Sequence, residues 1–207
     1  MTWLARKTYF ATAAAAAFLL APLSAGAQVY SDGFKFLEAV KKKEGEKANE
    51  LLNAPGSTVV NARDLSTGET GLHIAVARRD LTWMKFLTQK GANANIADNA
   101  GVTPLILSAQ LGFLEGVEVL IEGGARVDVA NNAGETPLIY AVHSGNRELA
   151  TVLLKAGADP DRRDNSGRSA RDYASERSGN TRMLQTIEEN EKPTAEREGA
   201  QTYGPSF

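Results

Sequence analysis

The 207-residue chain contains no cysteine and only two histidines, His73 and His143. Disulfide bonds and cysteine-based zinc or redox sites are therefore excluded, and few ligands remain for any other transition metal. Lysine and arginine number 23 against 25 aspartates and glutamates, so the formal net charge is −2. Because nucleic-acid binding depends on a basic surface that displaces counterions from phosphates, we expect no nucleic-acid partner.

Long hydrophobic runs are also absent, apart from one at the N-terminal end. Residues 10–21 are almost wholly apolar, follow a short segment with Arg6 and Lys7, and precede the small residues Ala25-Gly26-Ala27. A run of about 12 residues is shorter than the roughly 20 that cross a bilayer, which argues against an uncleaved membrane anchor. The pattern instead predicts a signal peptide over 1–27 that is cleaved after Ala27.

Export has consequences for the mature chain. A lipoprotein anchor would require a cysteine after the cleavage site, and the chain has none. We therefore expect a periplasmic protein of a Gram-negative cell that is not inserted in a membrane after signal cleavage. Such an oxidising compartment suits a chain without a free thiol.

Glycine is plentiful and regularly spaced. Two series of glycines each recur every 33 residues, and a threonine or serine follows each member of the first series by two positions. The first series is Gly68, Gly101, Gly134 and Gly167, and the second is Gly91, Gly124 and Gly157. A strict repeat of this length predicts supersecondary units that stack in one direction and share a continuous core.

One copy indicates why each unit should be a pair of helices. Thr136 is a suitable N-cap, because its hydroxyl can accept a hydrogen bond from a free backbone N–H, and Pro137 suits the first helical position. Gly145 is expected to end this helix. A second helix is predicted from Arg147 to Lys155, followed by Gly157 in the left-handed conformation that closes many helices.

The segment 134–138, Gly-Glu-Thr-Pro-Leu, resembles the ankyrin repeat, and 101–105 repeats the pattern with one change. The first full copy departs from it, because Gly71 stands where the pattern has proline. The resemblance implies an all-α solenoid of about five helix-turn-helix units, including a cap at each end, within residues 28–190. The approximate repeats are 31–64, 65–97, 98–130, 131–163 and 164–190.

Both ends of the array are expected to be caps. A helix pair predicted between Phe34 and Asn53 carries the charged residues 41–44 where apolar ones would face outward. The lysines of this run could also touch an anionic lipid surface, but the glutamates around them favour a solvated helix face. Residues 191–207 are rich in charge and poor in apolar groups, which predicts a disordered tail.

The two histidines are predicted to act separately. They lie two repeats apart, which is too far for joint metal binding or acid/base catalysis. The resemblance implies that His73 is buried and forms a hydrogen bond between repeats. His143 lies at the exposed end of an inner helix, a place where ankyrin proteins often touch a partner, and both a binding role and a solvated role fit it.

No catalytic pattern emerges from the sequence. A serine nucleophile would need a histidine base beside it, and the repeat glycines contain no phosphate-binding G-x-x-x-x-G-K-S/T run. Carboxylates such as Asp161, Asp164, Glu188 and Glu189 are isolated or lie at loop and helix ends. We therefore expect no enzymatic activity, cofactor or metal. A ligand-binding or enzymatic pocket between repeats is the alternative.

Residues without a packing role are predicted to form a strip on the concave face of the stack. In proteins that this chain resembles, such a strip binds another protein, and a rigid stack presents it at little ordering cost. Val102 and Leu111 would form an apolar centre within a polar rim. We expect a monomer that binds a partner protein, with self-association through this face as a further alternative. The strip consists of Glu69, Arg78, Asn99, Val102, Gln110, Leu111, Asn132, Glu135, His143, Ser144, Arg168, Glu176 and Arg177.

Overall fold

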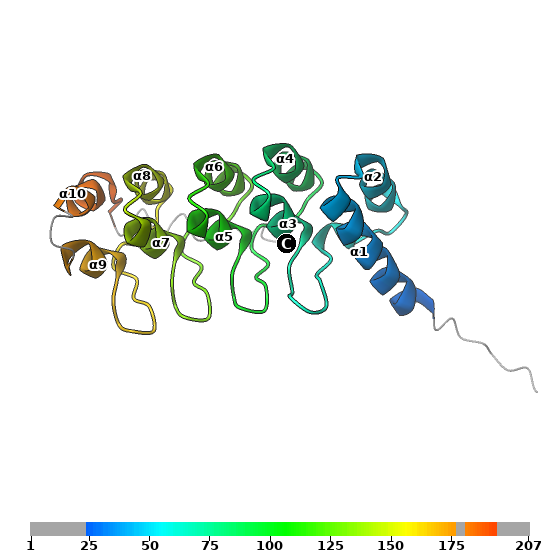
Figure 1. The fold of residues 1–207 in the computed structure, drawn as a ribbon, viewed down its shortest axis with the longest axis horizontal. Helices are drawn as coiled ribbons and strands as arrows, with labels where there is room; N and C mark the ends of the chain where they lie inside the picture. Colours follow the sequence, from blue (N-terminus) through cyan, green and yellow to red (C-terminus); the bar gives the residue numbers. More distant parts are fainter. Residues whose placement is uncertain (1–23, 177–180, 194–207) are drawn as a thin grey trace, which may run out of the picture.

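The computed structural model describes residues 24–176 and 181–193, and these residues form ten α-helices and one 3-10 turn, η1 (Val59–Asn61). The helices follow one another in five pairs (Figure 1). The pairs are α1 (Ser24–Lys42) with α2 (Gly45–Asn53), α3 (Gly71–Ala77) with α4 (Leu81–Gln89), α5 (Pro104–Gln110) with α6 (Leu114–Glu122), α7 (Pro137–Ser144) with α8 (Arg147–Lys155), and α9 (Ala170–Glu176) with α10 (Thr181–Asn190).

The pairs stack side by side in two rows of helices (Figure 1). The inner row holds α1, α3, α5, α7 and α9, and the outer row holds α2, α4, α6, α8 and α10. Neighbouring inner helices contact each other throughout, and neighbouring outer helices do so from α4 onwards. These contacts confirm the predicted all-α solenoid of stacked helix-turn-helix units.

The loops that lead from one pair to the next project beyond the inner row, and we call them fingers (Figure 1). The first to fourth fingers are residues 54–70, 90–103, 123–136 and 156–169. Within the described ranges the fingers contain no extended strand, only two isolated β-bridges, Arg63 with Thr70 and Arg163 with Ser169.

The helix ends in the fourth pair lie where their capping residues predict. Thr136 Oγ1 accepts a hydrogen bond from the Ile139 N–H at 3.3 Å, and Pro137 is the first residue of α7. Gly145, with φ 68°, ends α7. After α8 ends at Lys155, Gly157 has φ 98°. The predicted bounds of both helices are confirmed, since the signals that set them are local.

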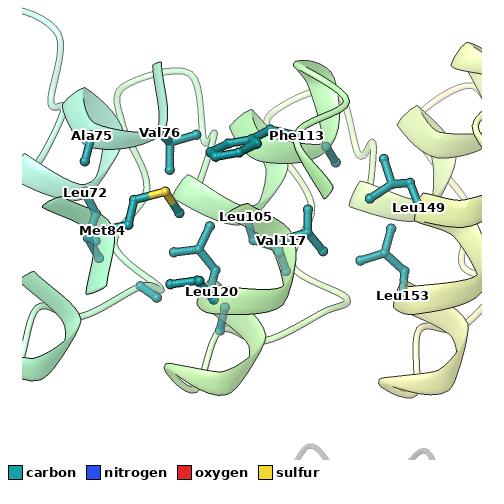
Figure 2. Packing of buried hydrophobic residues seen from close by; sticks show 14 of the residues in the cluster. Leu72, Ala75, Val76, Met84, Leu105, Phe113, Val117, Leu120, Leu149 and Leu153 are labelled. Carbon is teal, nitrogen blue, oxygen red and sulfur yellow. The ribbon is translucent and has the colours of Figure 1, made fainter. Parts of the chain in front are cut away.

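One continuous apolar core runs through the stack (Figure 2). Leucines recur at the same place in successive helices and are at most 1% exposed. The inner ones are Leu72, Leu105 and Leu138, and the outer ones are Leu87, Leu120 and Leu153. Burying such a side chain contributes about 1.5–3 kcal/mol, so the shared core holds together units that could not fold alone.

An ion-paired surface closes the C-terminal end of the stack. Arg171 occupies in α9 the place that Leu138 holds in α7, and its guanidinium bonds to the two carboxylate oxygens of Asp161 at 2.7 and 3.2 Å. It also contacts Glu191, the first residue of the predicted tail, whose N–H bonds to Ile187 O at 2.9 Å. The remainder of that tail, residues 194–207, lies outside the described residues.

The first pair differs from the others because its inner helix is longer. Helix α1 begins at Ser24, ten residues before the predicted start at Phe34, so the predicted cleavage site after Ala27 falls near the start of this helix. The rest of the predicted signal peptide, residues 1–23, lies outside the described residues. No helix in the described part of the chain combines the length and the apolar character needed to cross a membrane.

The lysine run at the end of α1 is balanced by carboxylates. Lys41 Nζ lies 3.5 Å from Glu38 Oε1 and 3.6 Å from Asp64 Oδ2, and Lys43 Nζ lies 2.8 Å from Asp80 Oδ2. Exposed pairs of this kind are individually weak. Together they agree with the predicted role of the run as a helix face of the N-terminal cap.

Candidate functional site

The predicted strip lies along the inner helices and the fingers. Each of its residues in the described ranges is exposed or half-buried, and each belongs to a finger, an inner helix or the turn after an inner helix. Arg177 lies outside the described residues. The fold therefore places the strip on one side of the stack, but its side chains have very different partners.

The asparagines of the strip hold neighbouring fingers together. Each carboxamide Nδ2 donates to a backbone carbonyl of the preceding finger, at 2.8 Å from Asn99 to Ser66 O and at 3.2 Å from Asn132 to Asn99 O. Asn165 makes the next bond, to Asn132 O at 2.9 Å. The prediction omitted Asn165, although its 33-residue spacing from Asn132 could have revealed it. This ladder gives all three side chains a structural role.

The first glycine series makes room for this ladder. Gly101 has φ 77°, and a Cβ built on it would lie 2.5 Å from Asn132 Oδ1. Gly167 has a similar φ of 82° but nothing within 4 Å of its Cβ position among the described residues. In a finger that is followed by another finger, glycine is therefore required both by the backbone conformation and by the close approach of the next finger.

His73 fastens α3 to the second finger. Its side chain is 1% exposed, and Nδ1 accepts a hydrogen bond from the Thr70 N–H at 3.0 Å, which assigns the ring proton to Nε2. Nε2 then donates to Val102 O at 2.9 Å. Burial lowers the pKa of His73 and favours the neutral ring that forms these bonds. The buried, inter-repeat role that the resemblance implies is confirmed.

Arg78 belongs to the packing of the N-terminal cap. Its Nη1 donates to Val40 O at 2.5 Å and to Lys41 O at 2.9 Å, two carbonyls at the end of α1. A cation is favoured at the C-terminal end of a helix, where the backbone carbonyls carry partial negative charge. Sequence reasoning missed this role because the partner carbonyls lie 37 and 38 residues earlier in the chain.

Tyr140 lies at the centre of a polar cluster on the strip, and the prediction omitted it. Its hydroxyl donates to Glu135 Oε2 at 2.5 Å, and Asn131 Nδ2 donates to the same oxygen at 3.0 Å. Burial and the nearby carboxylate of Glu135 raise the pKa of Tyr140. These bonds fix a half-buried aromatic ring on the inner side of the stack.

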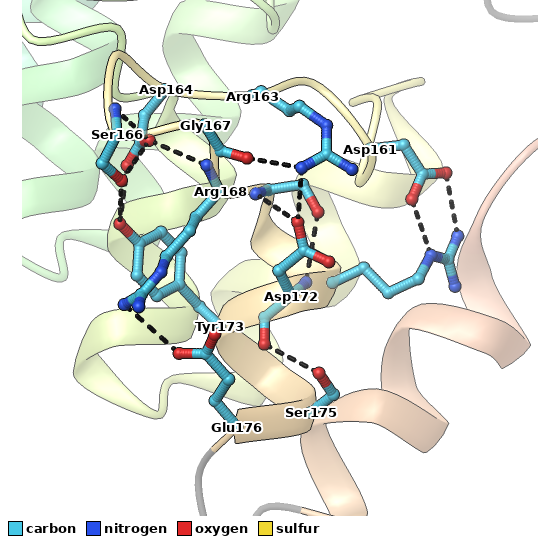
Figure 3. A network of polar contacts seen from close by, with 12 residues as sticks. Asp161, Arg163, Asp164, Ser166, Gly167, Arg168, Asp172, Tyr173, Ser175 and Glu176 are labelled. Atoms are coloured by element: carbon cyan, nitrogen blue, oxygen red, sulfur yellow. Dashed lines mark hydrogen bonds and ion pairs between the residues drawn. The ribbon is translucent and has the colours of Figure 1, made fainter.

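Tyr173 is the corresponding residue of α9 and is held in a similar way (Figure 3). Its hydroxyl donates to Asp164 Oδ2 at 2.6 Å, and Arg168 lies over the ring, 5.8 Å from its centroid. Burial acts to raise the pKa of Asp164. Hydrogen bonds from Ser166, Tyr173 and the backbone outweigh this effect and lower its pKa to about 2. The spacing of one 33-residue repeat between Tyr140 and Tyr173 could have revealed both tyrosines from the sequence.

Three predicted residues converge on Tyr173. The ring of His143 packs edge-on against it with 4.4 Å between centroids, and Arg168 Nη1 lies 3.3 Å from Glu176 Oε2. His143, Tyr173 and Glu176, together with Val142, line a shallow cleft of about 330 Å³. The predicted strip therefore forms a connected surface at its C-terminal end.

The predicted apolar centre lies near the middle of the stack. Val102 and Leu111 are half-buried, and their backbone carbonyls accept hydrogen bonds from His73 and Arg79, respectively. These bonds fix the backbone at both residues and leave their side chains partly exposed. Gln110 extends the surface toward the Tyr140 hydroxyl and acts to lower the pKa of that tyrosine.

The side chains of this surface differ from those of a metal or acid/base site. The described residues include no cluster of three or more histidines, aspartates or glutamates that could hold a metal ion. His73 and His143 lie on α3 and α7, with α5 between these helices. The strip offers fixed aromatic rings, an apolar centre and charged groups of both signs along several units of one rigid stack.

Comparisons with known proteins agree with this architecture. A family model described as ankyrin repeats (3 copies) matches residues 36–131, and one described as ankyrin repeats (many copies) matches residues 120–174. Together the two matches cover more than half of the chain. The ankyrin repeat protein FPV031 of fowlpox virus (strain NVSL) is 42% identical over 55 residues, which are 27% of this chain and 16% of that protein. The chain thus matches only a small part of this relative.

Proposed function

Since the chain belongs to the ankyrin-repeat family, whose repeats serve as protein-interaction modules, we propose that it binds a partner protein through the strip on its inner side. The observation that carries this proposal is the pair of tyrosines, Tyr140 and Tyr173, whose hydroxyls are anchored by Glu135 and Asp164. Such rings present a large contact area that is already ordered before a partner arrives.

The composition of the strip supports the same proposal. Interfaces between proteins concentrate their binding energy in a few aromatic or arginine side chains, surrounded by polar groups that exclude water. Tyr140, Tyr173 and Arg168 are candidates for that role, and Val102 and Leu111 add apolar area beside them. The ladder of asparagines between fingers keeps these groups in register along the stack.

We place this activity in the periplasm and regard the chain as non-enzymatic. The support for export is the sequence of residues 1–27, with a basic start, an apolar run and an A-x-A site. The support for a purely binding role is the family of the chain and the separation of its two histidines.

Proximity labelling in living cells tests the proposal. The strip variant carries Val102→Asp and Leu111→Asp, and a matched control carries Ile121→Asp and Val152→Asp, two half-buried aliphatic residues of the outer helices. Both variants gain two negative charges, and both are first checked for wild-type helix content.

The expected result is a small set of proteins that wild type and the control label and the strip variant loses. Fractionation of the labelled proteins also tests the periplasmic location, because the set should be periplasmic. Identical labelling by wild type and the strip variant would show that the strip is not the binding surface. Labelling confined to cytoplasmic proteins would contradict export.

A further inference from the structure

Two large apolar side chains stand out from the otherwise polar surface of the described residues. Phe34 on α1 is 65% exposed and Leu65 in the first finger is 85% exposed. Both line the same groove, of about 680 Å³, between α1 and the first finger. Leu37 and Val59 also line it and are themselves buried, so the groove has an apolar floor between two exposed apolar walls.

The hydrogen bonds between fingers identify Leu65 as an inserted residue. Each finger tip is closed by a bond between the N–H of an aspartate or asparagine and a later carbonyl. Four residues separate Asp64 from Glu69 O in the first finger, whereas three separate Asp98 from Val102 O in the second. The third and fourth fingers also have three, in the bonds from Asn131 to Glu135 O and from Asp164 to Arg168 O.

The bonds across to the second finger show which residue is extra. Asn99 N–H bonds to Thr67 O, just as Asn132 N–H bonds to Ala100 O, so Thr67 corresponds to Ala100. The Nδ2 bond of Asn99 to Ser66 O matches that of Asn132 to Asn99 O, so Ser66 corresponds to Asn99. Leu65 therefore has no counterpart in the next finger. It adds an exposed leucine where packing requires no residue at all.

The groove exists because α1 stands where a preceding finger would otherwise pack. The later fingers are joined to their predecessors by asparagine side chains, and a helix cannot supply that ladder. The first finger instead approaches α1 at its base, where a Cβ on Gly33 would lie 3.2 Å from Ala62 Cβ. Phe34 on α1 and Leu65, nearer the tip of the finger, both line the space between the helix and the finger.

Two charged side chains line the groove, Arg63 and Asp64. Arg63 lines it, with Nε donating to Gly68 O at 3.1 Å and Nη2 donating to Ala97 O at 3.0 Å. Among the described residues, no carboxylate oxygen comes within 4.0 Å of its guanidinium nitrogens. The neighbouring Asp64 accepts bonds from Ser66 and Thr67, which lower its pKa, and Lys41 lies 3.6 Å away. Asp64 therefore has a cation of its own in Lys41, whereas the guanidinium of Arg63 is held by backbone carbonyls and remains available to a carboxylate of a partner.

We propose that this groove binds a short segment of a partner protein, with one large apolar side chain between Phe34 and Leu65 and a neighbouring carboxylate on Arg63. A side chain of this kind buries on the order of 150–250 Å², far less than the roughly 800 Å² per partner of a stable dimer interface. A short segment therefore fits the groove better than a second copy of this chain. The inference rests on the proposed function as a protein-binding module, but it assigns a contact outside the predicted strip.

Selection from a random dodecapeptide phage library tests this inference. The target is the chain from residue 28, and the counter-selection uses the same chain with Leu65 deleted, which restores the tip length of the other fingers. We expect the enriched peptides to share a large apolar residue beside an aspartate or glutamate. A synthetic copy should bind at least tenfold more weakly to the deletion variant and to Phe34→Ser than to wild type.

The role of Arg63 is tested by removing the charge of the arginine and, separately, the charge of the peptide carboxylate. Arg63→Gln should weaken binding of the acidic peptide several-fold, but it should change little for the same peptide with its carboxylate replaced by an amide. Enriched peptides that bind wild type and the Leu65 deletion equally, that lack a common acidic residue, or that fail to appear above background would each overturn the proposal.

The strip variant with Val102→Asp and Leu111→Asp distinguishes this inference from the proposed function. It should bind the selected peptide as wild type does, because neither residue lines the groove. If that variant loses its cellular partners and the groove captures no peptide, the proposed function stands and the groove inference fails. If the groove captures its peptide and the strip variant keeps every partner, the strip is the part that fails.

Discussion

At the scale of single residues, one buried imidazole joins two units of the stack. His73 accepts a bond from Thr70 and donates one to Val102 O, and both require the neutral ring. A proton added to Nδ1 would remove the acceptor and place a charge in a buried site. The stability of the contact between the second and third units is therefore coupled to pH.

The sign of this coupling follows from the lowered pKa of His73. Because its pKa in the folded chain lies below the ordinary value of 6.5, the unfolded chain binds more protons between the two values. The contribution is fully present above about pH 6.5 and is lost as the pH falls toward the folded pKa, with a slope of at most about 1.4 kcal/mol per pH unit. Urea unfolding at several pH values between about 5.5 and 8 measures it.

The variant His73→Gln should flatten this pH dependence, and His143→Gln is measured beside it. His143 is exposed and makes an edge-on contact with Tyr173, so it serves as the control for loss of a histidine. An unchanged slope in His73→Gln would mean that other groups cause the pH dependence of stability.

Truncation of two leucines to alanine should change the stability of the chain by very different amounts. Leu105 is 1% exposed at the start of α5, and Leu105→Ala should cost about 2–5 kcal/mol because it leaves a cavity in the shared core. Leu65→Ala should change stability by less than about 0.5 kcal/mol, since its side chain is 85% exposed. Thermal and urea unfolding compare them. A similar loss in both variants would contradict the assignment of Leu65 as an inserted surface residue.

At the scale of the elements, the fingers depend on glycines for two separable reasons. Gly101 and Gly167 share a left-handed backbone, but only Gly101 has a neighbour that a side chain would strike. Alanine in the left-handed region costs about 1–2 kcal/mol, so Gly167→Ala measures the conformational part alone. Gly101→Ala should cost at least about 1 kcal/mol more, because Asn132 must also move away.

Equilibrium unfolding in urea measures both glycine variants, and the double variant Gly101→Ala with Asn132→Ala tests the cause of the difference. Removing the Asn132 carboxamide relieves the shortest contact, at 2.5 Å, but leaves the one to the Asn132 backbone nitrogen at 2.8 Å. The two changes together should therefore cost somewhat less than the sum of each alone. Simple additivity would show that the excess cost at Gly101 does not come from the Asn132 carboxamide.

Elements set by local signals could be predicted from the sequence, and those set by distant contacts could not. The bounds of α7 and α8 follow from capping residues within the same unit, and the 33-residue spacing predicts the stack. The start of α1 at Ser24 was missed because the residues up to Ala27 carry the pattern of a signal peptide. The role of Arg78 depends on the carbonyl end of α1, which only the packed fold brings near.

The place of the strip residues on the stack could be predicted from the sequence, but the side-chain contacts around them could not. The column of strip residues on the inner side was found from the repeat, whereas Tyr140 and Tyr173 were omitted although they are spaced by one repeat. Leu65 was also visible as one extra residue between Asp64 and Gly68, compared with Asp98 and Gly101. Such an insertion acquires meaning only when the bonds between fingers fix which residues correspond.

At the scale of the whole molecule, the stack presents two different surfaces that we propose bind partners. The strip uses side chains that repeat from unit to unit, whereas the groove beside α1 exists only where the regular array begins. The two surfaces meet at Asn99, which belongs to the strip and also lines the groove. The two ends of the stack must also avoid pairing with other copies, because stacked repeats of this kind otherwise expose an apolar end.

Arg171 is the residue that we expect to protect the C-terminal end. It replaces the leucine found in the same place in α3, α5 and α7, and it bonds to Asp161 and Glu191. Arg171→Leu restores the leucine column on the last unit and leaves those two carboxylates without their shared cation. We expect the chain to stay folded, with a loss of about 1 kcal/mol or less, and to self-associate end to end.

Multi-angle light scattering at several protein concentrations checks this expectation. The matched control is Arg182→Leu, because Arg182 is exposed on α10 and lies outside the leucine column. The average mass of Arg171→Leu should rise with concentration, while wild type and Arg182→Leu should keep a constant mass. If all three behave alike, the ion-paired cluster has no part in keeping the stack from growing, and the end must be protected by other residues.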